Sequence, residues 1–329
     1  MRFVIYGAGA VGGVIGARLH QHGHDVLLIA RGTHLAAICK EGLTLKTPNE
    51  TETFSIPAVS TPAEVDWREG DVAVMAMKGQ DTVEALDALR AAAGEGVPVV
   101  CCQNGVVNER MALRRFENVY GMAVMLPGTH LEPGVVQADS RLATGILDTG
   151  RYPQGTDDVA AEVCAALDGS TFSAVPRENI MDWKYSKLLS NLNNAIEAIC
   201  GAGARIKEIT QATRGEAETC YRAAGIPWID PDDYAERRRG LIEVNPVDFS
   251  GRAGNSSWQS LARGSRSIEA DYLNGEIALL GRLYGVPTPA NVVLQRVANR
   301  VAREGIEPGT VSADDLLAEV EAERSAVGA

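Results

Sequence analysis

The stretch that decides the fold is the N-terminal run Phe3-Val4-Ile5-Tyr6-Gly7-Ala8-Gly9-Ala10-Val11-Gly12. Its first four residues predict an apolar strand, and the glycine loop leads into a helix-spaced apolar face at positions 11, 14, 15 and 19. A second apolar strand is expected over residues 25–30, which completes a βαβ unit. The GxGxxG spelling is common by itself, but between a strand and a helix it is typical of a dinucleotide-binding fold.

Each glycine of the loop has a physical role in such a fold. Gly7 allows the tight turn, Gly9 lets a pyrophosphate approach the backbone, and Gly12 permits close packing of helix on strand. The free N–H groups of the helix N-terminus then hold the phosphates. A glycine turn without a ligand is the alternative. We expect the loop to bind the cofactor through Gly7, Ala8, Gly9, Ala10, Val11 and Gly12.

Arg31 indicates which nicotinamide cofactor would bind. It follows the second strand, at the tip where this fold meets the adenosine ribose. An NAD site would place an acid there, whereas a guanidinium favours the 2′-phosphate of NADP. Asp25 lies at the opposite end of that strand. We therefore predict NADPH/NADP, with a solvated strand-end arginine as the alternative.

Further strand and helix patterns extend this start into a doubly wound α/β sheet. Apolar runs over 71–76 and 97–102 are typical of strands buried on both faces, and the polar residues directly after them, including Lys78 and Asn104, should face a ligand. A hairpin-like excursion over 44–56 and a helix over 156–167 are expected, as are strands at 119–126, 135–138, 142–147 and 171–175. Long helical periodicities begin at residue 179. We predict a Rossmann-type domain over 1–176 and an all-helical C-terminal domain over 177–329.

Composition limits the classes of partner. The 329 residues carry a net charge of -12, so nucleic acid is not an expected partner, and the basic run at 237–239 is best explained as a solvated helix face. No apolar stretch approaches the length of a membrane span, and the N-terminus does not resemble a signal peptide. The six cysteines form no CxxC pair and are expected to be small buried residues. We expect a cytoplasmic protein without a bound metal.

Residues 179–200 predict one helix with two different stripes. At 100° per residue, Lys187, Asn191 and Asn194 fall within about 60° of one another, whereas an apolar stripe lies roughly 120° away. Asparagine is unfavourable in helices by about 0.6 kcal/mol relative to alanine, so a row of amides suggests a polar substrate. The alternative is a solvent-facing polar stripe with an ordinary surface lysine.

This helix, taken with motifs elsewhere, resembles the ketopantoate reductase (2-dehydropantoate 2-reductase) family over nearly the whole chain. The resemblance rests on an ordered set of residues: the glycine loop, Arg31, Lys78, Gln103-Asn104-Gly105, Trp183, Lys187-Leu188, Asn191, Asn194, Ser256-Ser257 and the segment Ile268-Glu269-Ala270-Asp271-Tyr272-Leu273-Asn274-Gly275. It implies NADPH-dependent reduction of ketopantoate, a step of pantothenate biosynthesis. It also allows a homodimer, since helical second domains of such reductases often form one.

Family roles transfer to matching positions. The resemblance implies that Lys187 is the catalytic lysine and that Glu269, near the cofactor and active site, is a second catalytic residue. The alternative for Glu269 is an acidic residue in the first turn of a helix that runs to Tyr284, where the helix dipole favours it. Lys78 and Asn104 would contact the cofactor, and substrate would be bound by Asn191, Asn194 and Ser257. Asn194 stands one position earlier than the second asparagine of better-known members, and Ile268 and Ala270 replace the usual Thr and Ile. Lys184, one turn before Lys187, is a rival for the catalytic role.

A lysine suits the implied reaction because hydride transfer to a ketone carbon places negative charge on its oxygen. A nearby ammonium stabilises that charge and supplies the proton. The same cation attracts the carboxylate of a 2-oxo acid, which amides and a serine hydroxyl can orient. Two alternatives remain: a family relative that reduces another carbonyl or an imine, and a non-catalytic NADP-binding regulatory protein.

Overall fold

The structure is a computed structural model that describes residues 1–204, 206–245, 247 and 254–327. These residues form two compact units. The first comprises Met1–Lys184 and Asp230–Phe249, and the second comprises Tyr185–Ile229 and Ser250–Ala329. The chain thus enters the second unit twice, whereas the sequence predicted a single boundary after residue 176.

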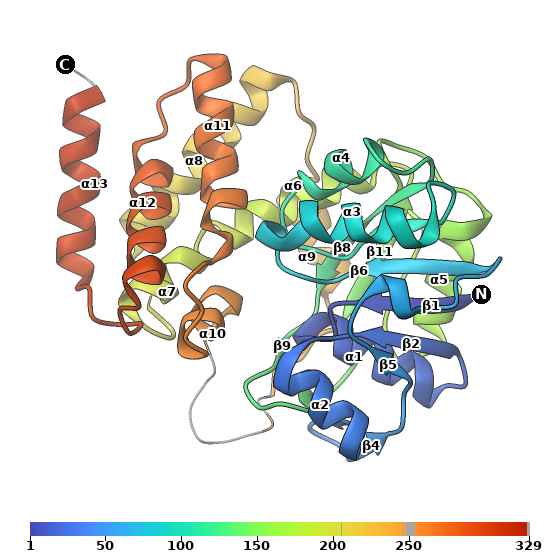
Figure 1. The fold of residues 1–329 in the computed structure, drawn as a ribbon. Coiled ribbons are helices and arrows are strands. Elements are labelled where there is room, and N and C mark those ends of the chain that lie inside the picture. The colour runs from blue at the N-terminus through green and yellow to red at the C-terminus, as the bar shows by residue number, and fades with distance from the viewer. Residues whose placement is uncertain (205, 246, 248–253, 328–329) are drawn as a thin grey trace. The chain divides into compact units, whose positions relative to one another are not determined.

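The first unit is built on a mainly parallel sheet in the strand order β11-β8-β7-β6-β1-β2-β5 (Figure 1). β1 pairs in parallel with β2 on one side and with β6 on the other, and β11 is an antiparallel edge strand. The strands are β1 (Arg2–Tyr6), β2 (Asp25–Ile29), β5 (Ala58–Val59), β6 (Asp71–Met75), β7 (Val99–Cys101), β8 (Val119–Met125) and β11 (Ile146–Arg151).

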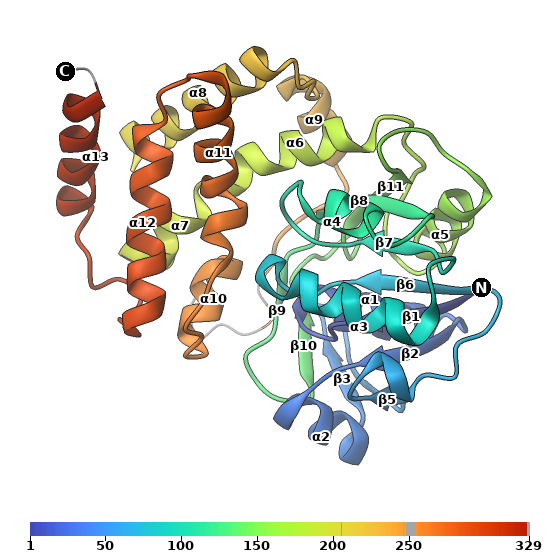
Figure 2. The same ribbon diagram turned by 45° about the horizontal axis from the view of Figure 1, so that its top comes forward.

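Helices cover both faces of this sheet, as the continuous apolar strands predict. In β6, Ala73 and Met75 pack towards α3 (Thr82–Ala93) and α4 (Asn108–Leu113), with the short turn η2 (Gly79–Asp81) before α3. The alternate β6 side chains belong to the core shared with α1 (Ala10–Gln21) and α5 (Asp158–Asp168). Figure 2 shows α3 in front of the sheet, running alongside its strands. The expected doubly wound fold is confirmed.

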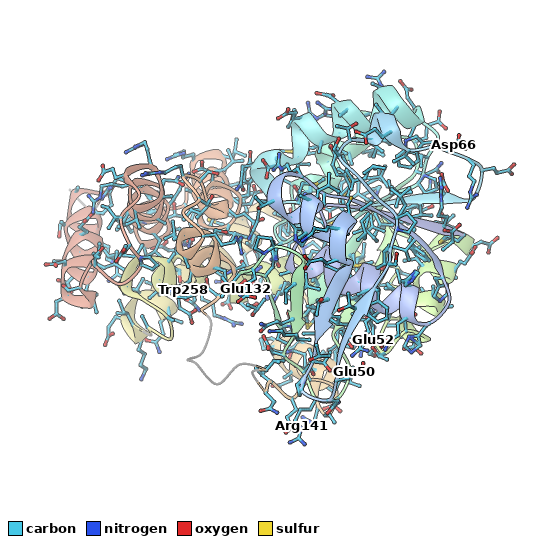
Figure 3. The ribbon with its side chains drawn as sticks, turned by 60° about the horizontal axis from the view of Figure 1, so that its bottom comes forward. Glu50, Glu52, Asp66, Glu132, Arg141 and Trp258 are labelled. Atoms are coloured by element: carbon cyan, nitrogen blue, oxygen red, sulfur yellow. The ribbon has the colours of Figure 1, made fainter. Side chains whose placement is uncertain are left out.

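A smaller sheet, in the order β4-β3-β10-β9, packs on the other side of α1. Its strands are β3 (Leu43–Lys46), β4 (Thr51–Phe54), β9 (Gly128–Thr129) and β10 (Val135–Ala138), with α2 (Gly32–Glu41) before β3 and η1 (Pro62–Glu64) after β5. The expected hairpin is the antiparallel pair β3 and β4. Glu50 and Glu52 lie side by side there (Figure 3), and Arg18 of α1 donates to Glu50 at 2.5 Å. α1 is therefore held between two sheets.

Residues 171–175 differ from the expected strand. They run beside β11 but form only isolated bridges, between Ser173 and Ile146 and between Pro176 and Thr149. The carboxylate of Asp148 in β11 takes part in holding this segment, since it accepts a hydrogen bond from the Val175 amide at 3.2 Å. Side-chain bonding thus replaces part of a regular ladder.

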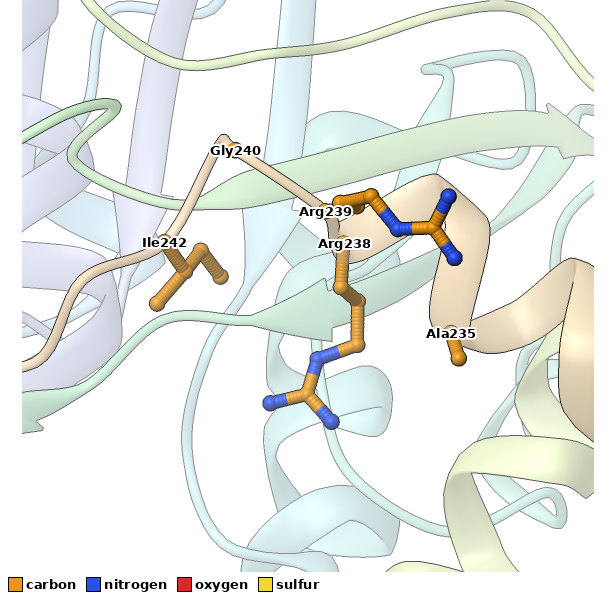
Figure 4. Close-up of a pocket in the computed structure, with 5 residues that line it drawn as sticks. All are labelled: Ala235, Arg238, Arg239, Gly240 and Ile242. Carbon is orange, nitrogen blue, oxygen red and sulfur yellow. The ribbon is translucent and has the colours of Figure 1, made fainter.

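The same Asp148 carboxylate corrects the expectation for the basic run at 237–239. Arg237, at the end of α9 (Pro231–Arg238), donates to Asp148 at 2.6 Å and is largely buried, so it is not a solvated side chain. Arg238 and Arg239 are exposed as expected. Figure 4 shows them lining a shallow surface pocket with Ala235, Gly240 and Ile242. The bonds from the Arg237 guanidinium to Asp148 explain why α9 belongs to the first unit.

The second unit is helical, as predicted. α6 (Ile180–Asn191) begins in the first unit and continues into the second, where it is followed by α7 (Asn194–Cys200), α8 (Lys207–Ala224), α10 (Ser256–Ala262), η3 (Glu269–Tyr272), α11 (Asn274–Tyr284), α12 (Pro289–Glu304) and α13 (Ala313–Val327). α12 lies between α11 and α13 (Figures 1 and 2) and contributes Val293, Leu294, Val297 and Val301 to the core. None of the described helices is both long enough and apolar enough to cross a membrane.

Candidate active site

The glycine loop has the geometry that a dinucleotide requires. Gly7 has a φ of +104°, and a Cβ there would lie 2.8 Å from the backbone nitrogen of Met77. A Cβ on Gly12 would press on the Gly7 carbonyl and lie 2.8 Å from the Cβ of Ala76. A Cβ on Gly9, in contrast, would meet no atom within 4 Å. Gly7 and Gly12 are therefore needed by the fold itself, whereas the space at Gly9 fits a bound group.

The N-terminus of α1 adds to that fit. Gly9 is its N-cap and supplies no side chain to bond the first amides, and the first turn of the helix carries no acidic residue. The positive end of the helix dipole is thus not offset by a local carboxylate. Together with the open space beside Gly9, this arrangement suits the pyrophosphate of a dinucleotide.

His34 supports the glycine loop through a hydrogen bond to the Ala8 carbonyl, a role that the sequence did not predict. The Gly134 amide donates to its Nδ1 at 2.9 Å, so Nε2 carries the proton that is donated to the Ala8 carbonyl at 2.7 Å. Burial lowers the pKa of His34 below its ordinary value of 6.5, against the opposing effect of the Ala8 carbonyl. The only signal in the sequence was a histidine three residues after Arg31.

Arg31 lies directly beyond β2, where it is the N-cap of α2. Its side chain is 79% exposed, and Nη2 lies 3.4 Å from Oδ1 of Asp81. Asp25, at the opposite end of β2, pairs with Arg68. The structure therefore places Arg31 at the carboxyl end of β2 and Asp25 at its other end.

The register of the central strands brings Lys78 and Asn104 to the same edge as the glycine loop. Tyr6, Met75 and Cys101 are partners in adjacent parallel strands, so β1, β6 and β7 end level with one another. We call this edge, with the loops that leave it at Gly7, Lys78 and Asn104, the strand-end edge. Ligands of open α/β sheets bind at such an edge.

The two lysines of α6 have different surroundings. Lys184 is 3% exposed, and its Nζ lies 2.6 Å from Oε1 of Glu109, in the core of the first unit. Lys187, one turn later, is only half-buried and belongs to the second unit. Lys184 is therefore enclosed in an ion pair and is not placed to meet a substrate, which removes it as a rival.

The single helix expected over 179–200 is interrupted between Asn191 and Asn194. Lys187 and Asn191 remain one turn apart in α6, whereas Asn194 begins α7. The interruption follows the run of helix-unfavourable asparagines. It leaves the carbonyl of Leu192 outside the helical ladder, and the buried Asn274 donates to that carbonyl at 3.1 Å. The three polar residues are thus not one continuous helical stripe.

Asn255 positions the serine pair. As N-cap of α10 its side-chain oxygen accepts from the amides of Ser257 and Trp258 at 3.1 and 3.2 Å, and its amide group donates to the Asn194 carbonyl at 3.2 Å. Ser257 is buried. The start of α10 and the start of α7 are therefore joined through one side chain that sequence reasoning missed.

Glu269 is buried, but it does not lie in the first turn of the helix that ends at Tyr284. It opens the separate turn η3, and Leu273 interrupts the backbone before α11 begins at Asn274. The sequence prediction continued the helix across this break, although the Asn274-Gly275 pair directly after Leu273 is unfavourable in a helix. Glu269 is therefore outside the first turn of α11, and the alternative of an acidic residue favoured by that helix dipole does not hold.

Two cysteines at the end of β7 are buried thiols. Burial raises the pKa of the Cys102 thiol to about 12 and that of Cys101 well above its usual range, so both remain protonated. Cys39 is exposed, contrary to the expectation that all six cysteines are buried. In the described part of the chain, the histidine, cysteine and acidic side chains form no group that could hold a metal ion.

Comparison with known proteins places the chain in a family. The pattern of the ketopantoate reductase PanE/ApbA family matches residues 3–152, and that of its C-terminal part matches residues 179–302. Among curated relatives, the 2-dehydropantoate 2-reductase of Pyrococcus horikoshii is 29% identical and covers 94% of this chain and 100% of its own. That of Mesorhizobium japonicum is 27% identical and covers 92% and 98%.

Solved structures agree. A PanE/ApbA family ketopantoate reductase from Ralstonia eutropha JMP134 is 30% identical, with a TM-score of 0.77 over 93% of this chain and 99% of its own. A D-mandelate dehydrogenase with NADH and anilino(oxo)acetate shares the fold at 24% identity, with a TM-score of 0.79 over 93% and 99%. The chain belongs to the ketopantoate reductase family of oxidoreductases, whose fold it has over both units.

Proposed function

We propose that this protein reduces a 2-oxo acid to a 2-hydroxy acid with NADPH, and that the substrate is ketopantoate. The observation that carries the proposal is the arrangement of α6: Lys187 is followed one turn later by Asn191, while Lys184 is enclosed by Glu109. The curated relatives, which are 2-dehydropantoate 2-reductases, support the same reaction. The cofactor supplies the hydride when bound.

Lys187 is the proton donor in this proposal. An ammonium group near the carbonyl oxygen stabilises the negative charge that develops there and then transfers a proton to it. Lysine is protonated at neutral pH, so it reaches the substrate ready to donate. Asn191 and Asn194 hold polar groups of the substrate, and the Ser257 hydroxyl donates to its carboxylate.

Glu269 has a supporting role in the proposal. Glu269 is buried and opens η3, and it matches the glutamate that the family resemblance places near the cofactor and active site. In the proposal its carboxylate accepts a hydrogen bond from a substrate hydroxyl or a ribose hydroxyl. Replacement of Glu269 by Gln should raise KM for the oxo acid and leave the free energy of unfolding nearly unchanged.

Arg31 supports NADPH over NADH. In the proposal, the exposed guanidinium of Arg31 at the carboxyl end of β2 attracts the 2′-phosphate of NADPH. Arg31→Ala should weaken NADPH binding far more than NADH binding. Equal weakening of the two would defeat the preference for NADPH.

The substrate is tested with a panel of oxo acids. Steady-state rates are measured with ketopantoate, pyruvate and phenylglyoxylate, each with NADPH and with NADH. The proposal expects the highest kcat/KM for ketopantoate with NADPH. The D-mandelate dehydrogenase among the structural neighbours favours one alternative, an aromatic 2-oxo acid, and a preference for phenylglyoxylate would establish it. Binding of NADPH without turnover of any carbonyl would support a regulatory protein instead.

A further inference from the structure

A fully buried ion pair lies in the first unit, next to the strand-end edge, and the proposed reaction does not use it. The Lys184 ammonium and the Glu109 carboxylate are 2.6 Å apart, with side-chain exposures of 2% and 0%. Removing two charges from water offsets most of the attraction between them, so such a pair is a poor source of stability. Its presence therefore calls for another explanation.

The ammonium of Lys184 holds backbone as well as Glu109. Nζ donates to the carbonyl of Gln103 at 2.9 Å, and the carbonyls of Met122 and Cys101 lie at 3.3 and 3.4 Å. Cys101 ends β7 and Met122 belongs to β8, its neighbour in the sheet. One cation thus joins two strands at the point where the chain turns into the loop that carries Asn104.

A chain of hydrogen bonds holds the other side of the same loop. Gln103 Nε2 donates to the hydroxyl of Thr82 at 2.7 Å, and that hydroxyl donates to the side-chain oxygen of Asn108 at 2.9 Å. The Asn108 amide group donates in turn to the carbonyl of Asn104 at 3.1 Å. Thr82 begins α3, just after the turn that starts at Lys78. The backbone on both sides of Asn104 is therefore fixed, and it is coupled to the Lys78 turn.

We propose that Lys184 and Glu109 are positioning residues for the cofactor, acting through the loop that carries Asn104. This inference rests on the proposed function, because it assumes that Asn104 contacts the nicotinamide cofactor. Lys184 provides the donors that hold the loop carbonyls, and Glu109 provides the countercharge that holds the ammonium in place. Lys184 also lies in α6, three residues before Lys187, so its displacement would disturb the start of the helix that carries the proton donor.

Replacing the pair by apolar residues separates positioning from stability. Lys184→Met and Glu109→Leu each leave one buried charge without its partner, and both single variants should unfold at lower urea concentration. The double variant removes both charges and should recover most of the urea midpoint. If the pair positions the loop, the double variant still binds NADPH about tenfold or more weakly than wild type, because no donor holds the Gln103 carbonyl.

A matched control uses Asp148, another buried carboxylate of the first unit. Arg237→Met removes one of the guanidinium groups that contact Asp148, far along the sheet order from β1. It should lower the urea midpoint yet leave the NADPH dissociation constant of the folded protein unchanged. If the double variant at 109 and 184 also binds NADPH with wild-type affinity, the pair is structural only and the inference is overturned.

A second readout does not depend on the cofactor. Amide hydrogen exchange at Asn104 and Gly105 in the ligand-free protein should be faster in the double variant than in wild type or in Arg237→Met. Unchanged exchange there would also overturn the inference. If wild-type protein fails to bind NADPH or NADH, the proposed function fails, whereas exchange at these amides still tests whether the pair holds the loop.

Discussion

The strand-end edge of the first unit and the helix interruption of the second are two ways of building a polar site. At the strand-end edge, parallel strands in register bring Gly7, Lys78 and Asn104 to one line, so the backbone ladder itself places them. At the interruption between α6 and α7, side chains distant in sequence donate hydrogen bonds to the backbone carbonyls of Leu192 and Asn194. Variants in the first region should therefore act on packing and cofactor binding, and variants in the second on substrate turnover.

The largest effect on stability is expected at Gly12. A Cβ there would press on the Gly7 carbonyl and on Ala76, so Gly12→Ala should destabilise the fold by about 3 kcal/mol. Urea unfolding measures the loss. Gly9→Ala is the control, because its methyl group meets no protein atom; it should keep wild-type stability but weaken NADPH binding about tenfold or more. Similar unfolding midpoints for the two variants would show that Gly12 is not required by the fold any more than Gly9 is.

Asn274→Ala tests the helix interruption. It leaves the Leu192 carbonyl and the side-chain oxygen of Asn291 without their donor, and should lower the free energy of unfolding by about 2 kcal/mol. Because the interruption separates Asn191 from Asn194, kcat should fall while NADPH affinity is kept. Asn299→Ala, which removes a surface bond to Asp271, should change stability by less than about 0.5 kcal/mol. Loss of NADPH binding in Asn274→Ala would show that the regions are not independent.

Replacement of Asn255 should have a smaller effect, and two variants separate its role as a helix cap from its contact with Asn194. Asn255→Ala removes the cap of α10 and should cost about 1 kcal/mol of stability. Asn255→Asp keeps the capping oxygen but loses the donor to the Asn194 carbonyl. If that donor positions the substrate side of the site, both variants raise KM for the oxo acid, although only the alanine variant loses the cap. Wild-type KM in the aspartate variant would assign Asn255 to capping alone.

The smallest effect is a pH dependence from His34. Its pKa is lowered in the folded protein, so the unfolded chain binds its proton first as pH falls. The stability contributed by neutral His34 is complete above pH 6.5 and is lost as pH falls from there through the lowered pKa. Urea midpoints measured from about pH 8 to about pH 5 should show this loss in wild type, and less of it in His34→Gln. If the urea midpoints of wild type and His34→Gln change equally with pH, His34 is not the source of the pH dependence.

Sequence reasoning predicted the first region better than the second for a physical reason. Strand periodicity and a glycine turn are local, and parallel register then aligns strand ends without further information. It failed where regular structure is interrupted by distant side chains: Asn274 bonds a carbonyl 82 positions away, and Asn255 one 61 positions away. The same limit explains why residues 171–175 were expected to form a strand and why Arg237 was expected in solvent.

Lys184 illustrates the limit within one helix. Its spacing from Lys187 gave both lysines a claim to the proton-donor role, and only the position of Glu109, 75 residues earlier, distinguishes them. The partner of a buried charge is set by the tertiary fold, which periodicity does not specify.

The proposed reaction depends on proton donation by the Lys187 ammonium, which the variant Lys187→Ala removes. Turnover of the preferred oxo acid should fall at least about a hundredfold, with an unchanged NADPH dissociation constant. Lys207→Ala, at an exposed lysine on α8, should retain full turnover. If Lys187→Ala keeps turnover within a few fold of wild type, the Lys187 ammonium is not the proton donor.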